Sequence, residues 1–186
     1  MARIKLIQPD EATGILSEVF ANLIEKRGKV SEVLAVQSLH PASIQSHLNL
    51  YMDIMFAKTS LSRPEKEMIA VVVSVTNGCV YCKTHHAVAL NNYWKDEARV
   101  TKLIADYKIA GLSFREAAMC TFAIHLTKYP AEHDNNDHTN TLKTAGLTDE
   151  GILDTVLVTA YFNFVNRIVL SLGVELEKEG GTGYKY

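Results

Sequence analysis

The sequence predicts an all-α protein, on three observations. Ser62 and Glu65 have the spacing of a capping box that starts a helix, and Ser113 and Glu116 repeat it. Apolar residues recur every three to four positions in most segments, which is the helical period. No segment has a competing strand pattern. Residues 71–73 are three valines, but they follow the first capping box within a long apolar run, so a buried helix is expected there.

Start and stop signals divide the first part of the chain into four helices. Asp10 is a candidate cap for a first helix over residues 10–28, which a glycine ends, and a shorter helix follows over residues 31–39. Pro41 suits the first turn of a third helix, where its missing N–H is not needed. The fourth helix is expected over residues 62–77, since an Asn-Gly pair breaks it.

The rest of the chain is also expected to be helical. The later helices are placed from residue 79 past residue 90, and over residues 96–107, 113–130, 137–146 and 148–172. Pro130 stops one of them, and Asp137 is a candidate cap for the short helix after it. The segment at 131–141 is polar and is interpreted as a loop. The Gly-rich tail over residues 177–186 is expected to be loosely attached.

Length and composition favour one domain. The 186 residues are 47% apolar, which is enough for one core. We divide the chain into N-terminal helices (1–60), a central core (61–128), and C-terminal helices with the tail (129–186). A net charge of −2 with scattered Lys and Arg gives no reason to expect nucleic acid. No apolar run approaches the length of a membrane-spanning helix, so no membrane partner and a cytoplasmic location are expected.

The residues that point to chemistry lie together in the centre of the chain. There are three cysteines, too few for a secreted disulfide scaffold, and two of them form a Cys79-x-x-Cys82 pair. If a helix starts there, Cys79, Cys82 and His86 share one face. A helix N-terminus, an imidazole and a second thiol each lower a thiol pKa, and the pair can close a disulfide. A redox centre is therefore favoured over half of a metal site.

A carboxylate in the preceding helix is the fourth candidate. Glu67 is followed at once by a long apolar run, so burial is expected to raise its pKa toward the range useful for proton transfer. It can reach the cysteine–histidine face if the two helices pack side by side. The alternative is an ordinary ion pair with Arg63, one turn earlier.

These residues resemble a known family. The pattern Glu67-x11-Cys79-x2-Cys82-x3-His86 is similar to the signature of the alkyl hydroperoxidase D / carboxymuconolactone decarboxylase superfamily, and the wording around the cysteines is closest to its peroxidase-related members. The resemblance implies a compact multi-helix domain of the alkyl hydroperoxidase D type, with the Cys-x-x-Cys at the start of a central helix. Tyr81 departs from the pattern, because the well-studied hydroperoxidase has a histidine there.

The resemblance also implies roles for the four residues. Cys82 would attack the O–O bond and become a sulfenic acid, and Cys79 would supply a proton and then resolve that acid as a disulfide. His86 and Glu67 would form the proton relay that deprotonates Cys82. The lactone-decarboxylase branch generally lacks the cysteine pair, so its reaction is disfavoured.

The function predicted is therefore a thiol-dependent peroxidase, an antioxidant enzyme that reduces hydrogen peroxide or an organic hydroperoxide. The partners expected are that hydroperoxide, a dithiol or thioredoxin-like electron donor, and further copies of the chain in a homo-oligomer. No cofactor and no metal are expected. Two alternatives stay open: a disulfide reductase or redox sensor that does not turn over peroxide, and a structural metal-binding module.

Several other residues receive plainer interpretations. A Cys2His2 metal site using both His85 and His86 is awkward, because adjacent helix residues point about 100° apart, and His85 is expected at the surface or an interface. Cys120 is expected to be a buried, inert thiol. The polar segment with His133, Asp134, Asp137 and His138 is interpreted as a solvated loop rather than a metal site, and His47 and His125 as core or interface residues. Asn163, Asn166 and Arg167 either line the pocket or tie subunits together.

Overall fold

The structure is a computed structural model that describes residues 2–178 and 180–182. Within these residues all regular elements are helices, which confirms the all-α prediction. The elements in chain order are α1 (Gly14–Arg27), α2 (Glu32–Ala35), α3 (Pro41–Met55), α4 (Arg63–Thr76), α5 (Val80–Trp94), α6 (Glu97–Ala105), the 3₁₀ turn η1 (Tyr107–Ile109), α7 (Phe114–Lys128), α8 (Glu132–Asn135), α9 (Thr139–Thr144) and α10 (Asp149–Leu172).

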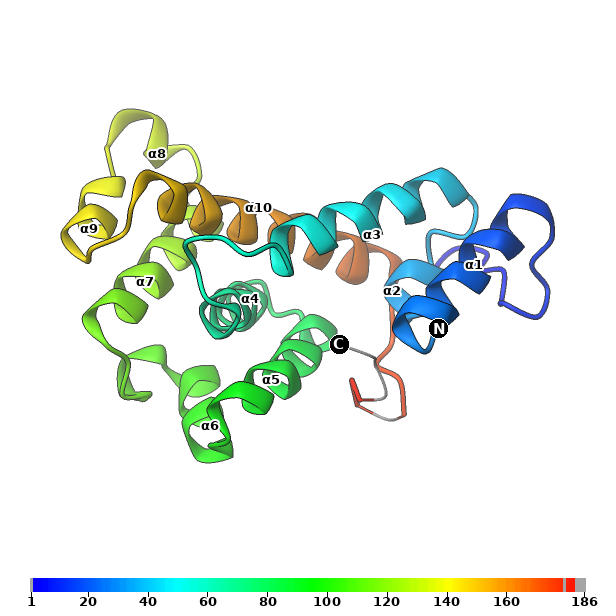
Figure 1. Cartoon of the computed structure of the whole chain (residues 1–186), viewed down its shortest axis with the longest axis horizontal. Coiled ribbons are helices and arrows are strands. Elements are labelled where there is room, and N and C mark those ends of the chain that lie inside the picture. Colours follow the sequence, from blue (N-terminus) through cyan, green and yellow to red (C-terminus); the bar gives the residue numbers. More distant parts are fainter. Residues whose placement is uncertain (1, 179, 183–186) are drawn as a thin grey trace.

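Helix α4 is the centre of the fold. It packs against α5, α7 and α10, and Figure 1 shows it nearly end-on with these helices around it. Every residue from 66 to 74 in this helix is buried. Its start is the predicted capping box, in which the Ser62 N–H donates to Glu65 Oε2 at 2.7 Å. A helix that is apolar all round is stable only in such a buried position.

A tight turn joins α4 to α5. Asn77 ends α4, and Gly78 has a φ of +68°, a left-handed conformation that favours glycine. The Cys79 N–H then donates to the Ser74 carbonyl at 2.8 Å. Cys79 becomes the residue that precedes the first turn of α5, so the cysteine pair starts a helix that lies against α4.

The N-terminal helices form a smaller hydrophobic cluster. Its buried members come from α1, α2 and α3: Leu16, Phe20, Leu23, Leu34, Ile44 and Leu48. In Figure 1 these helices occupy one end of the molecule, while α7, α8 and α9 occupy the other, and α10 runs along most of the length between the two ends. The division of the chain at residues 60 and 128 stays a prediction.

Several element bounds differ from the prediction. The first helix starts at Gly14 with Thr13 as its cap rather than at Asp10, and the second covers only Glu32–Ala35. The helix expected over residues 96–107 stops at Ala105, because the Asp106 side chain accepts the Lys108 N–H at 3.0 Å and competes with the helical backbone bonds. The polar segment expected as a loop contains the short α8.

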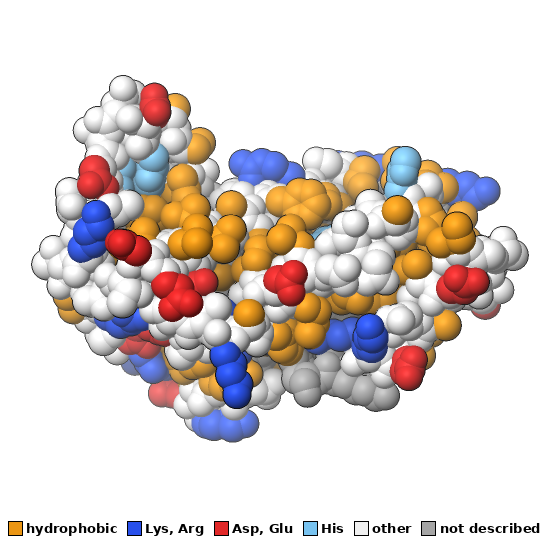
Figure 2. Space-filling model, turned by 45° about the horizontal axis from the view of Figure 1, so that its top comes forward, with side chains coloured by type: hydrophobic (Ala, Val, Ile, Leu, Met, Phe, Trp, Pro, Cys, Tyr) orange, Lys and Arg blue, Asp and Glu red, His pale blue; other side chains and the backbone are white. Residues whose placement is uncertain are grey.

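Helix α10 has the length and apolar composition that a membrane-spanning helix would need, alone among helices of the described residues. However, 44% of its most apolar window is buried inside the protein, and it packs against α3, α4 and α7. We therefore interpret it as a core helix. Its outer face exposes Leu153, Leu157, Phe164 and Leu170, and Figure 2 shows hydrophobic side chains in a broken band along the long axis of one face. The homo-oligomer stays a prediction.

The central position of α4 predicts an unequal response to two matched substitutions. Ile69→Ala removes a side chain that is 0% exposed in α4 and should lower the free energy of unfolding by about 2–5 kcal/mol, through lost burial and a cavity. Ile15→Ala changes a side chain that is 70% exposed in α1 and should change the free energy of unfolding by about 0.5 kcal/mol or less. Urea titrations followed by circular dichroism measure both. Equal losses would contradict the assignment of α4 as the core helix.

Candidate active site

Glu67 lies on α4, where it pairs with Arg63 of the same helix and contacts His86 of α5. Its side chain is fully buried. Oε1 accepts a hydrogen bond from Arg63 Nε at 2.8 Å, and Arg63 Nη2 lies 2.6 Å from it as an ion pair. Oε2 lies 2.6 Å from Nδ1 of His86. The expected contact between Glu67 and the cysteine–histidine face is therefore direct, and the ion pair with Arg63 that was the alternative is present as well.

The pKa expected for Glu67 was wrong in direction. Burial alone would raise the pKa of this carboxyl, but the charges and hydrogen bonds of His86 and Arg63 reverse the effect, and the pKa lies below its usual value. Glu67 is thus a permanent carboxylate near neutral pH. Its hydrogen bond fixes the orientation of the His86 ring.

The two thiols of the cysteine pair have unequal pKa values. Both side chains are buried, and both cysteines are free. The hydrogen bond from Cys82, helped by the backbone N–H groups of residues 82 and 81, lowers the pKa of Cys79, although burial acts the other way. That same sulfur–sulfur contact, together with burial and the charge of Cys79, raises the pKa of Cys82 well above its usual range. In the resting pair the thiolate is therefore favoured on Cys79, and Cys82 keeps its proton.

Cys82 is the cysteine that reaches the pocket. A cavity of about 100 Å³ lies among α1, α3, α5 and α10, and its lining includes Cys82 and His86 together with the aromatic rings of Tyr51, Tyr161 and Phe162. Cys79 is 0% exposed and lies behind Cys82. No hydrogen bond joins His86 to Cys82 in the described part of the chain, although both side chains line the same pocket.

Tyr81 and His85 hold the segment that follows α10. The Tyr81 hydroxyl donates to Glu177 Oε1 at 2.7 Å, and His85 Nε2 lies 2.7 Å from Glu177 Oε2. The two rings stack with centroids 4.4 Å apart. His85 was expected at the surface or an interface; its side chain is only 12% exposed and contacts the segment after α10. The tail expected to be loose is thus anchored at Glu177, while residues 183–186 lie outside the described residues.

Asn166 is a further site residue, which the sequence left open between lining the pocket and tying subunits together. It is fully buried, its Oδ1 accepts from the Asn77 side chain at 2.9 Å, and its amide donates to Ser74 Oγ at 3.3 Å and to the Cys82 sulfur, which lowers the pKa of that thiol. Asn163 accepts from Asn77 and donates to Thr127 of α7. Arg167 is exposed and donates to the Asn163 carbonyl oxygen at 2.7 Å. The signal available in the sequence was the presence of Asn163 and Asn166 on an otherwise apolar helix, where buried polar side chains need hydrogen-bond partners.

Two of the plainer interpretations agree with the structure. His47 is buried with both ring nitrogens paired, to Gln37 and Tyr161 at 2.8 Å each, and burial lowers its pKa to about 4. It is therefore a core histidine that also lines the pocket. Cys120 is buried, and burial raises the pKa of its thiol, so it stays protonated at neutral pH.

The histidines beside the cysteine pair do not complete a metal site with it. His86 turns to Glu67 and His85 turns to Glu177, so the two rings engage different carboxylates. Among residues 2–178 and 180–182, three ligand groups come close enough for an ion only at His125, His133 and His138. The solvated-loop interpretation was therefore wrong for His133 and His138, whose rings are partly buried against α7, whereas Asp134 and Asp137 are exposed as expected.

The contacts of Tyr81 and His85 with Glu177, which we call the clasp, predict that the stability of the folded protein depends on pH. Burial would raise the pKa of this carboxyl, but hydrogen bonds from His85 and Tyr81 lower it from 4.5 to about 2. The unfolded chain takes up this proton near pH 4.5 and the folded chain only near pH 2, so the stabilisation is complete above pH 4.5 and is lost as the pH falls. Glu177→Gln should reduce the slope of the unfolding free energy in that window by up to about 1.4 kcal/mol per pH unit.

Urea titrations from pH 5 to pH 3 measure this slope. The matched control is Glu18→Gln, which changes an exposed residue of α1 and should leave the slope nearly unchanged. An identical slope for Glu177→Gln and the parent chain would contradict the clasp.

Comparisons with known proteins agree with this fold. The carboxymuconolactone decarboxylase family matches residues 42–123, which include all four candidate residues. An uncharacterized peroxidase-related protein from Silicibacter sp. TM1040 is 29% identical with a TM-score of 0.87, covering 99% of this chain and 96% of that one. A second one, from Ralstonia eutropha JMP134 and described as an alkylhydroperoxidase AhpD core, is 25% identical with a TM-score of 0.85, covering 97% and 94%.

Two further likenesses are more distant. The uncharacterized protein YdfG of Bacillus subtilis is 26% identical over 116 residues, which are 62% of this chain and 78% of that protein. The debrominase Bmp8 is 20% identical, with a TM-score of 0.77 over 95% of this chain and 92% of its own, and at that identity it shares the fold alone. The helical fold, the family match over residues 42–123 and the peroxidase-related neighbours support the alkyl hydroperoxidase D / carboxymuconolactone decarboxylase superfamily, in its peroxidase-related branch, for this chain.

Proposed function

We propose that this chain is a thiol-dependent peroxidase that reduces a small hydroperoxide through Cys82 and Cys79. The observation that carries the proposal is the unequal placement of the two sulfurs. Cys82 lines the pocket, whereas Cys79 lies behind it with a lowered pKa. This arrangement supports Cys82 as the residue that meets the substrate and Cys79 as the residue that then reacts with oxidised Cys82.

In the first step Cys82 is oxidised. It passes its proton to the Cys79 thiolate along their shared hydrogen bond, which leaves a thiolate on the pocket side. This sulfur attacks the nearer peroxide oxygen, the O–O bond breaks, and Cys82 becomes a sulfenic acid. The leaving oxygen takes the proton held by Cys79 and departs as an alcohol, or as water when the substrate is hydrogen peroxide.

In the second step Cys79 resolves the sulfenic acid. It is again a thiolate, which the N-terminus of α5 stabilises, and it attacks the Cys82 sulfur. The S–O bond breaks, and the leaving hydroxide takes a proton from the His86 imidazolium, which Glu67 stabilises. The products are a Cys79–Cys82 disulfide, one alcohol and one water. A dithiol or thioredoxin-like donor then supplies two electrons and two protons to restore the pair and His86.

The pocket favours a small, partly apolar substrate. Its volume of about 100 Å³ is well below the roughly 300–1,000 Å³ of sites for drug-sized ligands. Its aromatic lining suits an organic hydroperoxide of a few carbon atoms at least as well as hydrogen peroxide. His47 has a pKa of about 4, so it stays neutral near pH 7 and adds no positive charge to the lining.

The comparisons support an enzyme of this kind without naming its reaction. Two neighbours at 25–29% identity are described as peroxidase-related. The name of the matched family refers to a decarboxylase, but that branch generally lacks the cysteine pair that this chain has. Bmp8 is a debrominase, so the same fold also serves other chemistry. A cytoplasmic location and a homo-oligomer remain part of the proposal.

Cysteine variants test the proposed roles. Cys82→Ser should abolish hydroperoxide consumption in an assay with cumene or tert-butyl hydroperoxide, hydrogen peroxide and a dithiol reductant. Cys79→Ser should consume about one equivalent of hydroperoxide and then stop, with a sulfenic acid on Cys82 that dimedone traps and mass spectrometry locates. Cys120→Ser, the matched control at the third cysteine, should retain full turnover. Turnover by Cys82→Ser would refute the mechanism. A disulfide that forms with negligible peroxide turnover would instead favour the redox sensor.

Asn166 provides a test of the pKa argument. Asn166→Ala removes the hydrogen bond to the Cys82 sulfur, so the pKa of that thiol should rise further. We expect kcat/KM for hydroperoxide at pH 7 to fall by about 2- to 10-fold, the value of one lost hydrogen bond, and to recover as the pH is raised. The control is Asn163→Ala, which disturbs the same network without touching the sulfur. A loss of rate that does not depend on pH would contradict the role of Asn166.

A further inference from the structure

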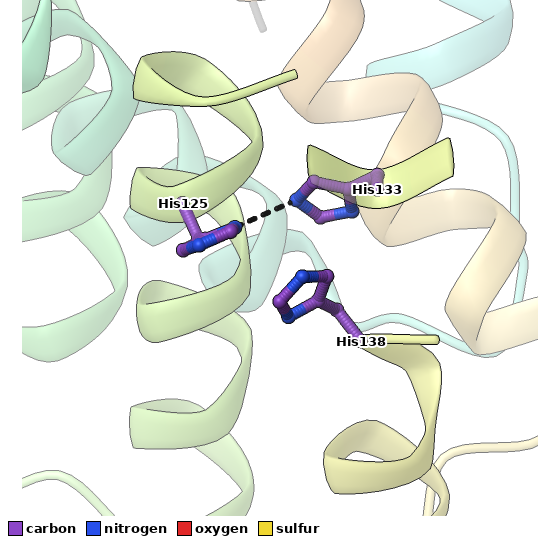
Figure 3. A group of neighbouring side chains, drawn as sticks. All are labelled: His125, His133 and His138. Carbon is purple, nitrogen blue, oxygen red and sulfur yellow. Dashed lines mark hydrogen bonds between the residues drawn. The ribbon is translucent and has the colours of Figure 1, made fainter. Parts of the chain in front are cut away.

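Three histidines meet at the end of the molecule that is formed by α7, α8 and α9. His125 comes from α7, His133 from α8, and His138 directly precedes α9. Figure 3 shows the three rings turned toward one another across the gap between these elements. Histidine side chains also reach the surface at this end in Figure 2, so solvent has access to the group. None of the three lines the pocket of Cys82.

The rings are closely spaced. His125 Nδ1 and His133 Nε2 lie 3.0 Å apart. The ring of His138 has its centroid 4.2 Å from that of His125 and 4.4 Å from that of His133. One nitrogen from each ring can be chosen so that all three lie within 4.8 Å of one another. Ligands of one tetrahedral Zn²⁺ are roughly 3.3 Å apart, given Zn–N bonds of about 2.0 Å. The group is thus within a small side-chain movement of a ligand set.

We propose that His125, His133 and His138 form a binding site for a divalent transition metal ion of the kind that prefers imidazole, with Zn²⁺ as the representative. Three imidazole rings converge here, and none of them lines the pocket of Cys82. Imidazole nitrogen is a preferred ligand of zinc, copper and nickel, and hard oxygen-seeking ions such as Mg²⁺ do not favour it. A water molecule would complete a four-coordinate site.

The surroundings of His125 match those of a metal-ligating histidine. Its Nε2 lies 3.2 Å from Glu132 Oε2. A carboxylate that accepts the N–H of one ring nitrogen fixes the tautomer and leaves the other nitrogen free to bind a metal. That other nitrogen is Nδ1, the atom already facing His133. Glu132 therefore acts as an orienting residue for the ligand.

The third histidine supplies an independent observation. Nε2 of His138 is buried and has no hydrogen-bond partner among the described residues. A buried polar nitrogen without a partner is destabilising, so this atom is better satisfied by an ion than by its present surroundings. Phe122 packs edge-on against the His133 ring, with centroids 5.2 Å apart, which holds that ring beside α7. An ion here would tie the polar segment around α8 to the body of the protein.

Metal binding should be measured on a chain whose cysteine pair cannot compete. In the Cys79→Ser/Cys82→Ser background we expect one Zn²⁺ per chain in competition with a chromophoric chelator, and Co²⁺ should give a visible spectrum without sulfur ligation. His133→Gln and His138→Gln should each weaken Zn²⁺ binding by at least about tenfold, and Glu132→Gln by about 10- to 100-fold. The matched control is His40→Gln, at an exposed histidine outside the group, which should bind as the parent does.

A second measurement separates binding at the site from adventitious binding. Zn²⁺ should raise the midpoint of thermal unfolding in the parent background but not in His133→Gln, because an ion that binds only the folded state stabilises it. The proposal is overturned if the parent background binds no Zn²⁺ saturably, or if binding persists unchanged in both histidine variants. Peroxide turnover of the otherwise native chain should be unaffected by His138→Gln, since His138 lies outside the pocket.

Discussion

A buried carboxylate with two cationic partners is the interaction on which the site depends. Glu67 has no contact with solvent, so its charge is tolerated only because Arg63 and His86 both bond to it. The same contacts set the relative position of α4 and α5, since Arg63 and Glu67 belong to one helix and His86 to the other. Breaking either pair would leave an uncompensated charge in the core. The geometry of the cysteine face and the stability of the central helix pair therefore have a common origin.

Local signals predicted most of the fold. The capping box at Ser62 and Glu65 sets the start of α4, and the residues at 77–78 set its end, because caps and glycine turns act within a few residues. The order of helices and the shared face of Cys79, Cys82 and His86 followed from such signals. The start of α1 was mispredicted, and so was the end of α6. At α6 the Asp106 side chain bonds the nearby backbone and competes with the helix, which a sequence pattern does not rank.

Properties that depend on distant contacts could not be predicted in the same way. The sign of the Glu67 pKa shift depends on two partners that act together, whereas the apolar sequence around it indicated only burial. The partner of His85 is 92 residues away, and no local pattern links them. His125, His133 and His138 were each visible in the sequence, but their convergence depends on how α8 folds back on α7. The sequence showed Asn166 as a polar residue on an apolar helix, but it did not indicate that Asn166 contacts Cys82.

Under the proposed function, the clasp on Glu177 would limit how the Cys79–Cys82 disulfide is reduced again. The cysteine pair is buried, and Tyr81 and His85, on either side of Cys82 in α5, grip the C-terminal segment. A redox protein that acts as the donor would have to bring its own sulfur to a buried disulfide beside this anchored segment. Reduction of the Cys79–Cys82 disulfide would then require a reductant small enough to enter through the pocket, or a donor protein whose binding displaces the C-terminal segment. Under the proposed function, the contacts of Glu177 therefore control how a reductant reaches the disulfide.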